Sequence, residues 1–185
     1  MNSKETVKIS VNIIDKIKSR EILGIISFSL LMSISAQIII PVQPVPFTLQ
    51  TMIVLLSGAF LGSRNGFISQ IIYLFMGILG LPVFAGFSSG IFKLFGPTGG
   101  YLLSFPFAAF LVGYLVEKKN SNLILLMSFI LGELIILLGG ASYLNLFFNG
   151  NLKQTLFHGV FIFSLWDIIK IIAAFSIYKA LKIKK

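Results

Sequence analysis

Residues 121–140 read SNLILLMSFILGELIILLGG, an apolar run that contains a single charged side chain, Glu133. A helix of about 20 mainly apolar residues is long enough to span the hydrocarbon core of a bilayer. This run therefore predicts a transmembrane helix, and the chain on either side of it repeats the pattern.

The composition of the whole chain has the same character. Its 185 residues are 56% hydrophobic and 11% charged, whereas soluble domains are about 45–50% apolar and about 25% charged. Polar surface is too scarce for a soluble protein, so the sequence predicts an integral membrane protein. Spans of about 20 residues would use most of the length and leave no room for a sizeable soluble domain.

We expect an all-α integral membrane protein with six transmembrane helices. A single membrane domain is expected over residues 22–180. The polar segment 1–21 before it is expected to be cytoplasmic and to resemble an interfacial amphipathic helix, and residues 181–185 form a basic cytoplasmic tail. The six spans are placed near 22–40, 48–62, 65–81, 99–116, 121–140 and 156–178.

The distribution of Lys and Arg predicts the orientation of these spans. If both termini lie on one side, most of the 15 basic residues fall on that side, and only Lys93 and Lys153 fall on the other, with Lys170 inside the sixth span. Cytoplasmic connections of membrane proteins carry the excess of basic residues. The sequence therefore predicts a multi-pass protein of the cell membrane with both termini cytoplasmic, and the net charge of +9 is explained by lipid headgroups without a nucleic acid.

Several kinds of chemistry are missing from the sequence. There is no cysteine, and the only histidine is His158, so we expect no disulfide, no histidine-rich metal site and no cofactor. The motifs GxxxxGK[ST] and HExxH are absent, and no nucleophile and base stand at catalytic spacing. The chain is not expected to be an enzyme or to hydrolyse ATP.

Three charged residues fall inside the apolar spans: Glu133, Asp167 and Lys170. An ionised side chain at the bilayer centre costs at least about 2.5 kcal/mol, so such residues are usually paired or functional. Asp167 and Lys170 are three apart on one helix and therefore share a face. They could form a structural ion pair, or a dipolar ligand could insert with N–H donors on Asp167 and an anion on Lys170. Two interpretations of Glu133 remain open. Its carboxyl group could be protonated or hydrogen-bonded within the helix bundle, or it could contact a ligand.

The expected external connections have unusual compositions. Residues 41–47 contain three prolines and no charge, and residues 82–98 combine glycines with phenylalanines. Apolar, glycine-rich connections suit the lining of a pocket, although membrane re-entrance or simple packing would give the same composition. On the first span, Ser29 and Ser33 are four apart and offer a small face for close helix contact, either within the chain or with a partner subunit.

Several linked sequence motifs are shared with a known protein family. They are Ala36-Gln37-Ile38, Ile40-Pro41, the run Pro44 to Thr51 (PVPFTLQT), Gly80 to Gly86 (GLPVFAG), Gly96 to Leu102 (GPTGGYL) and the late pair Asp167 and Lys170. Over about residues 22–180 the chain resembles the BioY family, the biotin-specific substrate-binding (S) components of energy-coupling factor (ECF) transporters.

This resemblance implies a six-helix bundle with an external pocket and the high-affinity capture of biotin from outside the cell. It also implies partners, namely a transmembrane coupling subunit and two cytoplasmic ATPase subunits that supply the energy. The family's docking motif of two alanines on the first helix corresponds here to Ser29 and Ser33, and its glycine pair after Phe-Ala corresponds to Gly86-Phe87. By the same resemblance, the ligand-binding residues are expected to be Asp167, Lys170, Gln43, Thr48, Phe84, Gly86, Gly99, Gly100 and Tyr101.

One alternative from another class of transporter remains. A self-sufficient secondary transporter of a small vitamin-like solute could couple to protons through Glu133 or Asp167. Accumulation of substrate by the chain alone, under a pH gradient, would favour it.

Overall fold

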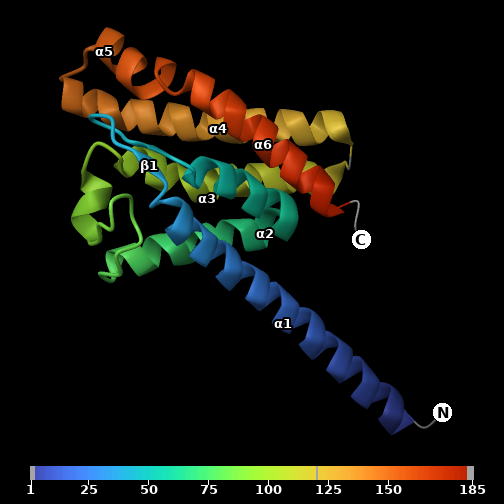
Figure 1. The fold of residues 1–185 in the computed structure, drawn as a ribbon. Helices are drawn as coiled ribbons and strands as arrows, with labels where there is room; N and C mark the ends of the chain where they lie inside the picture. The colour runs from blue at the N-terminus through green and yellow to red at the C-terminus, as the bar shows by residue number, and fades with distance from the viewer. Residues whose placement is uncertain (1–2, 120, 183–185) are drawn as a thin grey trace.

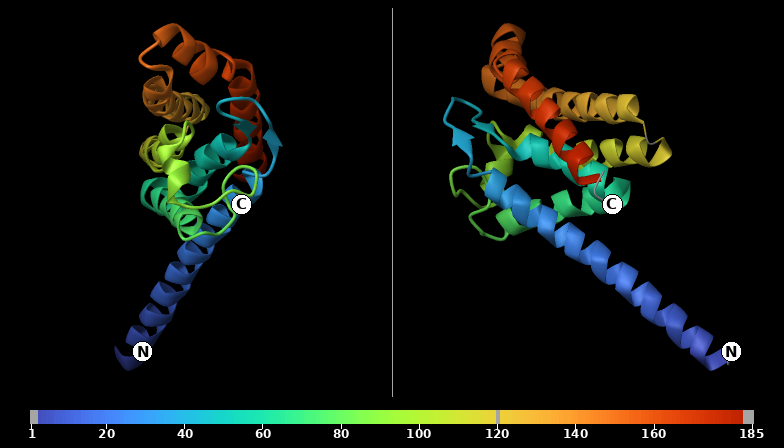
Figure 2. Two further views of the ribbon diagram at one scale, coloured as in Figure 1. Left: turned by 90° about the vertical axis from the view of Figure 1, so that its left-hand side faces the viewer. Right: turned by 45° about the vertical axis from the view of Figure 1, so that its right-hand side comes forward.

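The computed structural model describes residues 3–119 and 121–182, with side chains from Lys18 onward. Figure 1 shows a bundle of long helices from which the N-terminal half of the first helix projects obliquely, as the turned views in Figure 2 confirm. The long helices are α1 (Ser3–Ser35), α2 (Gln50–Ile78), α3 (Gly99–Lys118), α4 (Asn122–Leu144) and α6 (Ser164–Lys182). The short elements are β1 (Ile39–Ile40), β2 (Phe47–Thr48), η1 (Ile91–Phe95), η2 (Asn145–Phe148), α5 (Leu152–Leu156) and η3 (Phe157–Phe161).

The outer surface of the bundle is suited to lipid. Within the described residues, four helical stretches are long and apolar enough to cross a membrane, namely 50–78, 99–118, 122–148 and 152–182. Large apolar side chains also point outward, and Leu23, Leu138 and Leu165 are each more than half exposed. Extended apolar surface of this kind is unfavourable in water but favourable against acyl chains. The helical membrane class predicted from the sequence agrees with these features.

The second and third expected spans form one element, α2, which reverses direction at Gly62. A straight helix would place Gln50 and Tyr73 about 35 Å apart, yet Gln50 Nε2 donates a hydrogen bond of 2.6 Å to the Tyr73 hydroxyl. Gly62 has φ 81° and ψ 178°, a left-handed conformation that favours glycine. Gly58 and Gly66 let the two halves touch, because a Cβ on Gly66 would lie 2.9 Å from the Gly58 Cα.

The reversal is capped by a side chain from α3. The backbone N–H of Ser63 donates to Glu117 Oε1 at 2.9 Å, and the Ser63 hydroxyl donates to Glu117 Oε2 at 2.8 Å. A carboxylate at the start of a helical segment satisfies backbone donors and interacts favourably with the helix dipole. Glu117 thereby fixes the second half of α2 against the end of α3.

The connections that carry more basic residues lie at one end of the bundle, and those that carry fewer lie at the other. One end holds the α2 reversal, the α3–α4 connection and the end of α6. The other end holds the hairpin formed by β1 and β2, the 79–98 loop and the α4–α6 connection (Figure 1). Arg64, Lys118 and Lys119 therefore lie near the first end, whereas Lys93 and Lys153 lie near the second. This grouping matches the charge asymmetry that the sequence predicts.

Several element boundaries differ from the expected ones. Helix α1 continues through residue 21 without a break and ends at Ser35, because residues 39–48 form the antiparallel hairpin of β1 and β2 instead of extending the first span. In the sixth span, the regular α-helix begins only at Ser164, after the π-helical turn η3. Of the expected basic tail, residues 183–185 lie outside the described residues.

Candidate ligand-binding site

A cavity of about 60 Å³ lies at the loop end of the bundle, between the β-hairpin, the 79–98 loop and helices α2, α3, α4 and α6. Its walls are mostly apolar and aromatic, and its polar groups are few, which is the usual composition of a small-molecule site. The apolar lining consists of Val45, Pro46, Phe84, Ala85, Tyr101, Leu102, Phe105, Ile136, Leu137 and Phe163. The polar lining consists of Thr48, Gln50, Thr51, Lys93, Thr98, Glu133, Asp167 and Lys170.

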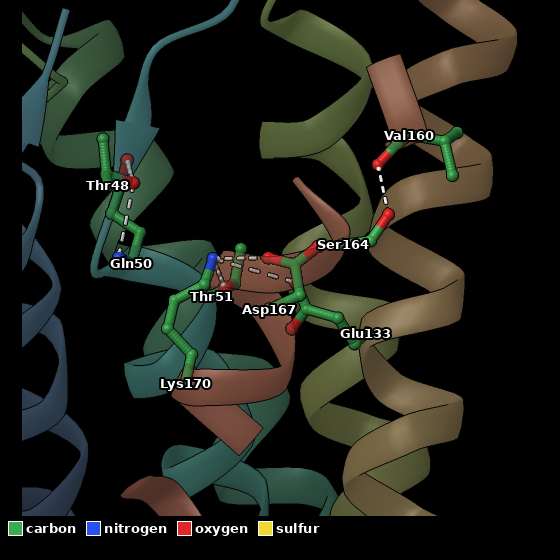
Figure 3. Close-up of polar contacts among 8 residues, drawn as sticks. All are labelled: Thr48, Gln50, Thr51, Glu133, Val160, Ser164, Asp167 and Lys170. Atoms are coloured by element: carbon green, nitrogen blue, oxygen red, sulfur yellow. Dashed lines mark hydrogen bonds and ion pairs between the residues drawn. The ribbon is translucent and has the colours of Figure 1, made fainter. Parts of the chain in front are cut away.

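The charged groups of this cavity converge on the Lys170 ammonium group. Lys170 Nζ lies 2.7 Å from Asp167 Oδ1 and donates a hydrogen bond of 2.6 Å to Thr51 Oγ1. Glu133 Oε1, from α4, lies 4.0 Å from the same nitrogen. Figure 3 shows the side chains reaching this point from α2, α4 and α6. The site therefore joins one cation and two carboxyl groups from three separate parts of the chain.

All three ionisable side chains are withdrawn from the surface. Asp167, Lys170 and Glu133 are 4%, 5% and 3% exposed. In the described part of the chain, Asp167 Oδ2 and both Glu133 oxygens are buried without a hydrogen-bond partner. Buried polar atoms are nearly always hydrogen-bonded, so these three acceptor atoms, which border a cavity, are suited to a ligand that brings N–H or O–H donors.

The 79–98 loop is held over the cavity by contacts on two sides. Gln37, just after α1, donates to the Phe84 carbonyl at 3.1 Å and accepts from the Phe87 N–H at 2.9 Å. On the other side, the Tyr73 hydroxyl, which accepts from Gln50, donates to the Val83 carbonyl at 3.2 Å. The Phe84 side chain is thus fixed as a wall of the cavity.

The loop tip also accommodates the residue that departs from the family pattern. Phe87 stands where the resemblance places the second glycine of a pair, and it adopts φ 54°. A left-handed conformation is uncommon for a non-glycine residue. Its side chain is 71% exposed, so the bulkier tip points away from the core and does not fill the cavity.

The structure brings together five of the residues expected to bind ligand. Thr48, Phe84, Tyr101, Asp167 and Lys170 all line the cavity. Tyr101 also donates a hydrogen bond of 2.8 Å to the Gly159 carbonyl in η3, so it ties the α4–α6 connection to the cavity wall.

The other four expected residues lie around the cavity and not in its lining. Gly99 and Gly100 are buried in the first turn of α3, where a Cβ would collide with the Leu94 backbone or with Tyr143. Gly86 lies at the loop tip with φ 71°, and Gln43 lines an open hollow on the outer surface. The glycines allow close approach and turning of the backbone, and Gln43 lies in an outer hollow that shares Lys93 and Thr98 with the cavity lining.

Other lining residues were not among those expected from the sequence. Thr51 and Gln50 belong to the PVPFTLQT motif and could have been found from it, since they follow Thr48 within one helical turn. Lys93 is isolated in the glycine-rich connection, and its only sequence signal is that it is a base on the sparsely charged side. Phe163 precedes α6 and has no distinguishing pattern.

The two serines expected to dock a partner lie on α1. Ser29 is 1% exposed, and its hydroxyl donates to the Ser69 carbonyl of α2 at 2.8 Å. Ser33 is half-buried and donates to the Ser29 carbonyl at 3.1 Å. In this structure Ser29 therefore serves the contact between α1 and α2, and its role in docking stays a prediction.

Known proteins resemble the chain over nearly its full length. The model of the BioY family matches residues 5–184. A protein described as a probable biotin transporter BioY from Pyrococcus horikoshii is 42% identical, over 89% of this chain and 98% of the relative. The biotin transporter BioY of Thermotoga maritima is also 42% identical, over 85% of this chain and 92% of the relative. A crystal structure of the S-component for biotin from an ECF-type ABC transporter superposes with a TM-score of 0.81 at 27% identity, covering 98% of this chain and 94% of the other.

Proposed function

This chain belongs to the BioY family, and from that premise we propose that it captures biotin outside the cell as the substrate-binding subunit of an ECF-type importer. It is a transporter component and not an enzyme. The observation that carries the proposal is the cavity itself: an apolar chamber whose inner end holds the Asp167–Lys170 pair and buried acceptor atoms without partners among the described residues.

The chemistry of biotin fits this chamber. Its bicyclic head presents two N–H donors and a carbonyl acceptor on the ureido ring, an apolar thioether side and, at the far end, an anionic valerate chain. The Asp167 Oδ2 atom can receive an N–H group, and aromatic side chains such as Phe84 and Phe163 offer apolar walls.

The charge balance indicates which end of biotin enters first. Lys170 is already neutralised by Asp167 at 2.7 Å, and a second carboxyl group, Glu133, lies beside it. This inner end therefore does not attract another anion. Lys93 lines both the cavity and the outer hollow, and the linings of the two contain no acidic residue beyond Glu133 and Asp167. We place the ureido ring at Asp167 and the valerate at Lys93, in place of the expected contact between the anion and Lys170.

The cavity must widen to admit the ligand. Its volume of about 60 Å³ is well below the roughly 300–1,000 Å³ of typical small-molecule sites. The walls formed by the β-hairpin and the 79–98 loop are connections, whereas the remaining walls are packed helices. The connections are therefore the parts that move when biotin enters.

The membrane arrangement and the partners belong to the same proposal. Six spans arise if α1 and the two halves of α2 each cross the membrane together with α3, α4 and α6. The basic end of the bundle then faces the cytoplasm with both termini. A transmembrane coupling subunit and two ATPase subunits supply the energy, since the sequence has no phosphate-binding loop of its own. Docking through Ser29 requires α1 to shift against α2, because Ser29 is buried in that contact, whereas Ser33 is half-buried.

Mass spectrometry of small molecules that co-purify with the detergent-solubilised chain tests the proposal directly. Biotin in the eluate, at close to one molecule per chain, is the expected result. An eluate free of biotin, together with no binding of added biotin, would contradict it. Reconstituted chain that accumulates biotin alone under a pH gradient would instead support the ion-coupled transporter.

A further inference from the structure

The two carboxyl groups beside Lys170 have different surroundings, and this difference assigns a role to Glu133. We propose that Glu133 is a second ligand-contacting and specificity-determining residue, which receives one ureido N–H group of biotin while Asp167 receives the other. This inference rests on the proposed function and adds to it a residue on a different helix.

Glu133 is not needed to satisfy Lys170. An ammonium group has three donors. One is directed at Asp167 Oδ1 at 2.7 Å and another at Thr51 Oγ1 at 2.6 Å. Glu133 Oε1, at 4.0 Å, is beyond hydrogen-bond distance. The Asp167–Lys170 pair is already neutral, so Glu133 adds a surplus carboxyl group to a buried site.

That surplus group is costly unless something else contacts it. Glu133 is 3% exposed and borders the cavity. Its carboxyl group lies near Asp167 and Thr51, but within the described residues neither of its oxygens accepts a hydrogen bond of good geometry from a protein donor. An unsatisfied buried acceptor is unfavourable, and more so when it is charged. Inside a membrane bundle, such a residue is expected to serve a ligand or a transported species.

The rigid position of Glu133 supports a recognition role. It follows Gly132, where a Cβ would lie 2.7 Å from side-chain atoms of Leu55 and Val112, so α4 is packed closely against α2 and α3 at this level. Figure 3 shows the Glu133 side chain extending from α4 toward the Lys170 and Asp167 groups of α6. A contact group on a tightly packed helix holds its geometry better than one on a loop.

The acceptors and donors of this cluster match the head of biotin. The partnerless acceptors are Asp167 Oδ2 and the two Glu133 oxygens, and Lys170 retains one donor. A cyclic urea presents two N–H groups with a carbonyl oxygen between them. With one N–H on each carboxyl group and the carbonyl on Lys170, each polar group of the ureido ring gains a partner of the right kind.

The test is a comparison of Glu133→Met and Asp167→Asn against the unchanged chain, using purified protein in detergent. Titration calorimetry would measure the affinity for biotin and for two analogues, each carrying a methyl group on one of the two ureido nitrogens. Glu133→Gln is the milder variant, because an amide keeps one acceptor oxygen. Leu134→Met, on the exposed side of α4, is the matched control for a methionine in this helix.

We expect Glu133→Met to weaken biotin binding by about 10- to 100-fold and Glu133→Gln by less, with Leu134→Met unchanged. For one methylated analogue, Glu133→Met should cost no further affinity, because the N–H that it contacted is already gone. For the other analogue, Asp167→Asn should cost no further affinity, because that analogue lacks the N–H group that Asp167 contacts. This crossed pattern identifies the nitrogen that each carboxyl group contacts.

Two outcomes would overturn the inference. Unchanged biotin affinity in Glu133→Met would remove Glu133 from the site. An equal loss for biotin and both analogues would show that Glu133 only supports the local structure. Failure of the unchanged chain to bind biotin is a different result, since it would contradict the proposed function itself.

Discussion

Lys170 Nζ and Asp167 Oδ1 lie 2.7 Å apart within one turn of α6, and both side chains are almost fully withdrawn from the surface. The pair cancels its own charge, which makes burial tolerable, and still leaves Asp167 Oδ2 without a partner in the described part of the chain. A purely structural pair would be expected to satisfy both oxygens, so the geometry favours a pair that also holds a ligand.

The first prediction concerns this remaining oxygen. Asp167→Asn should weaken biotin binding by about 10- to 100-fold, because a hydrogen bond to a charged group contributes roughly 1.5–3 kcal/mol. Equilibrium binding of labelled biotin to purified protein measures the effect. Glu21→Gln, which neutralises an exposed acid on α1, is the control. An Asp167→Asn variant with full affinity would exclude this carboxylate from the site.

The second prediction concerns the entrance. If Lys93 receives the valerate anion, Lys93→Gln should reduce the affinity for biotin several-fold but leave the affinity for the uncharged biotin methyl ester almost unchanged. Competition binding with the two ligands measures this difference. Lys153→Gln, at the same end of the bundle, is the control. Equal losses for acid and ester would mean that Lys93 acts on loop structure and not on the anion.

The third prediction concerns the α2 reversal. An alanine at Gly62 must adopt φ near 81°, and its Cβ would collide with Glu117 Oε1. This combination of positive φ and extended ψ is essentially confined to glycine and costs another residue about 1–3 kcal/mol. Gly62→Ala should therefore lower the thermal midpoint in detergent. Gly150→Ala is a matched control, because Gly150 has φ 80° and a Cβ added there would meet nothing within 4 Å. Similar shifts in the two variants would show that close packing at the reversal contributes little.

The sequence was sufficient for features that depend on local pattern. Long apolar runs predicted the main helices, and the spacing of three predicted that Asp167 and Lys170 share a face. The small residues Gly58, Gly62 and Gly66 were visible as interruptions of the second and third spans. Their joint role was not visible, because a helical hairpin requires one positive φ at Gly62 and direct contact between the other two.

Contacts between distant segments could not be predicted in this way. Glu133 and Lys170 lie on different helices, so no spacing rule relates them, and the sequence left the role of Glu133 open. Gln37 was recognised only as part of a motif, whereas its amide holds the 79–98 loop from the end of α1. The π-helical turn η3 likewise involves a long-range bond, from Tyr101 to Gly159.

The last prediction separates two roles for the serines of α1. Ser29 is packed against Ser69, so Ser29→Trp should overfill the contact between α1 and α2 and destabilise the isolated chain by about 1–3 kcal/mol. Ser27→Trp, on the exposed side of the same helix, should leave stability unchanged. Thermal unfolding in detergent measures both effects.

Ser33 is only half-buried, and Ser33→Trp therefore tests docking more directly. If the small face of α1 meets the coupling subunit, this variant should bind biotin normally but fail to co-purify with the coupling and ATPase subunits, since an indole prevents close helix approach. Ser27→Trp again serves as the control, because it adds the same indole on another face. Normal assembly of Ser33→Trp, together with loss of assembly in Ser27→Trp, would move the docking surface to the exposed face of α1.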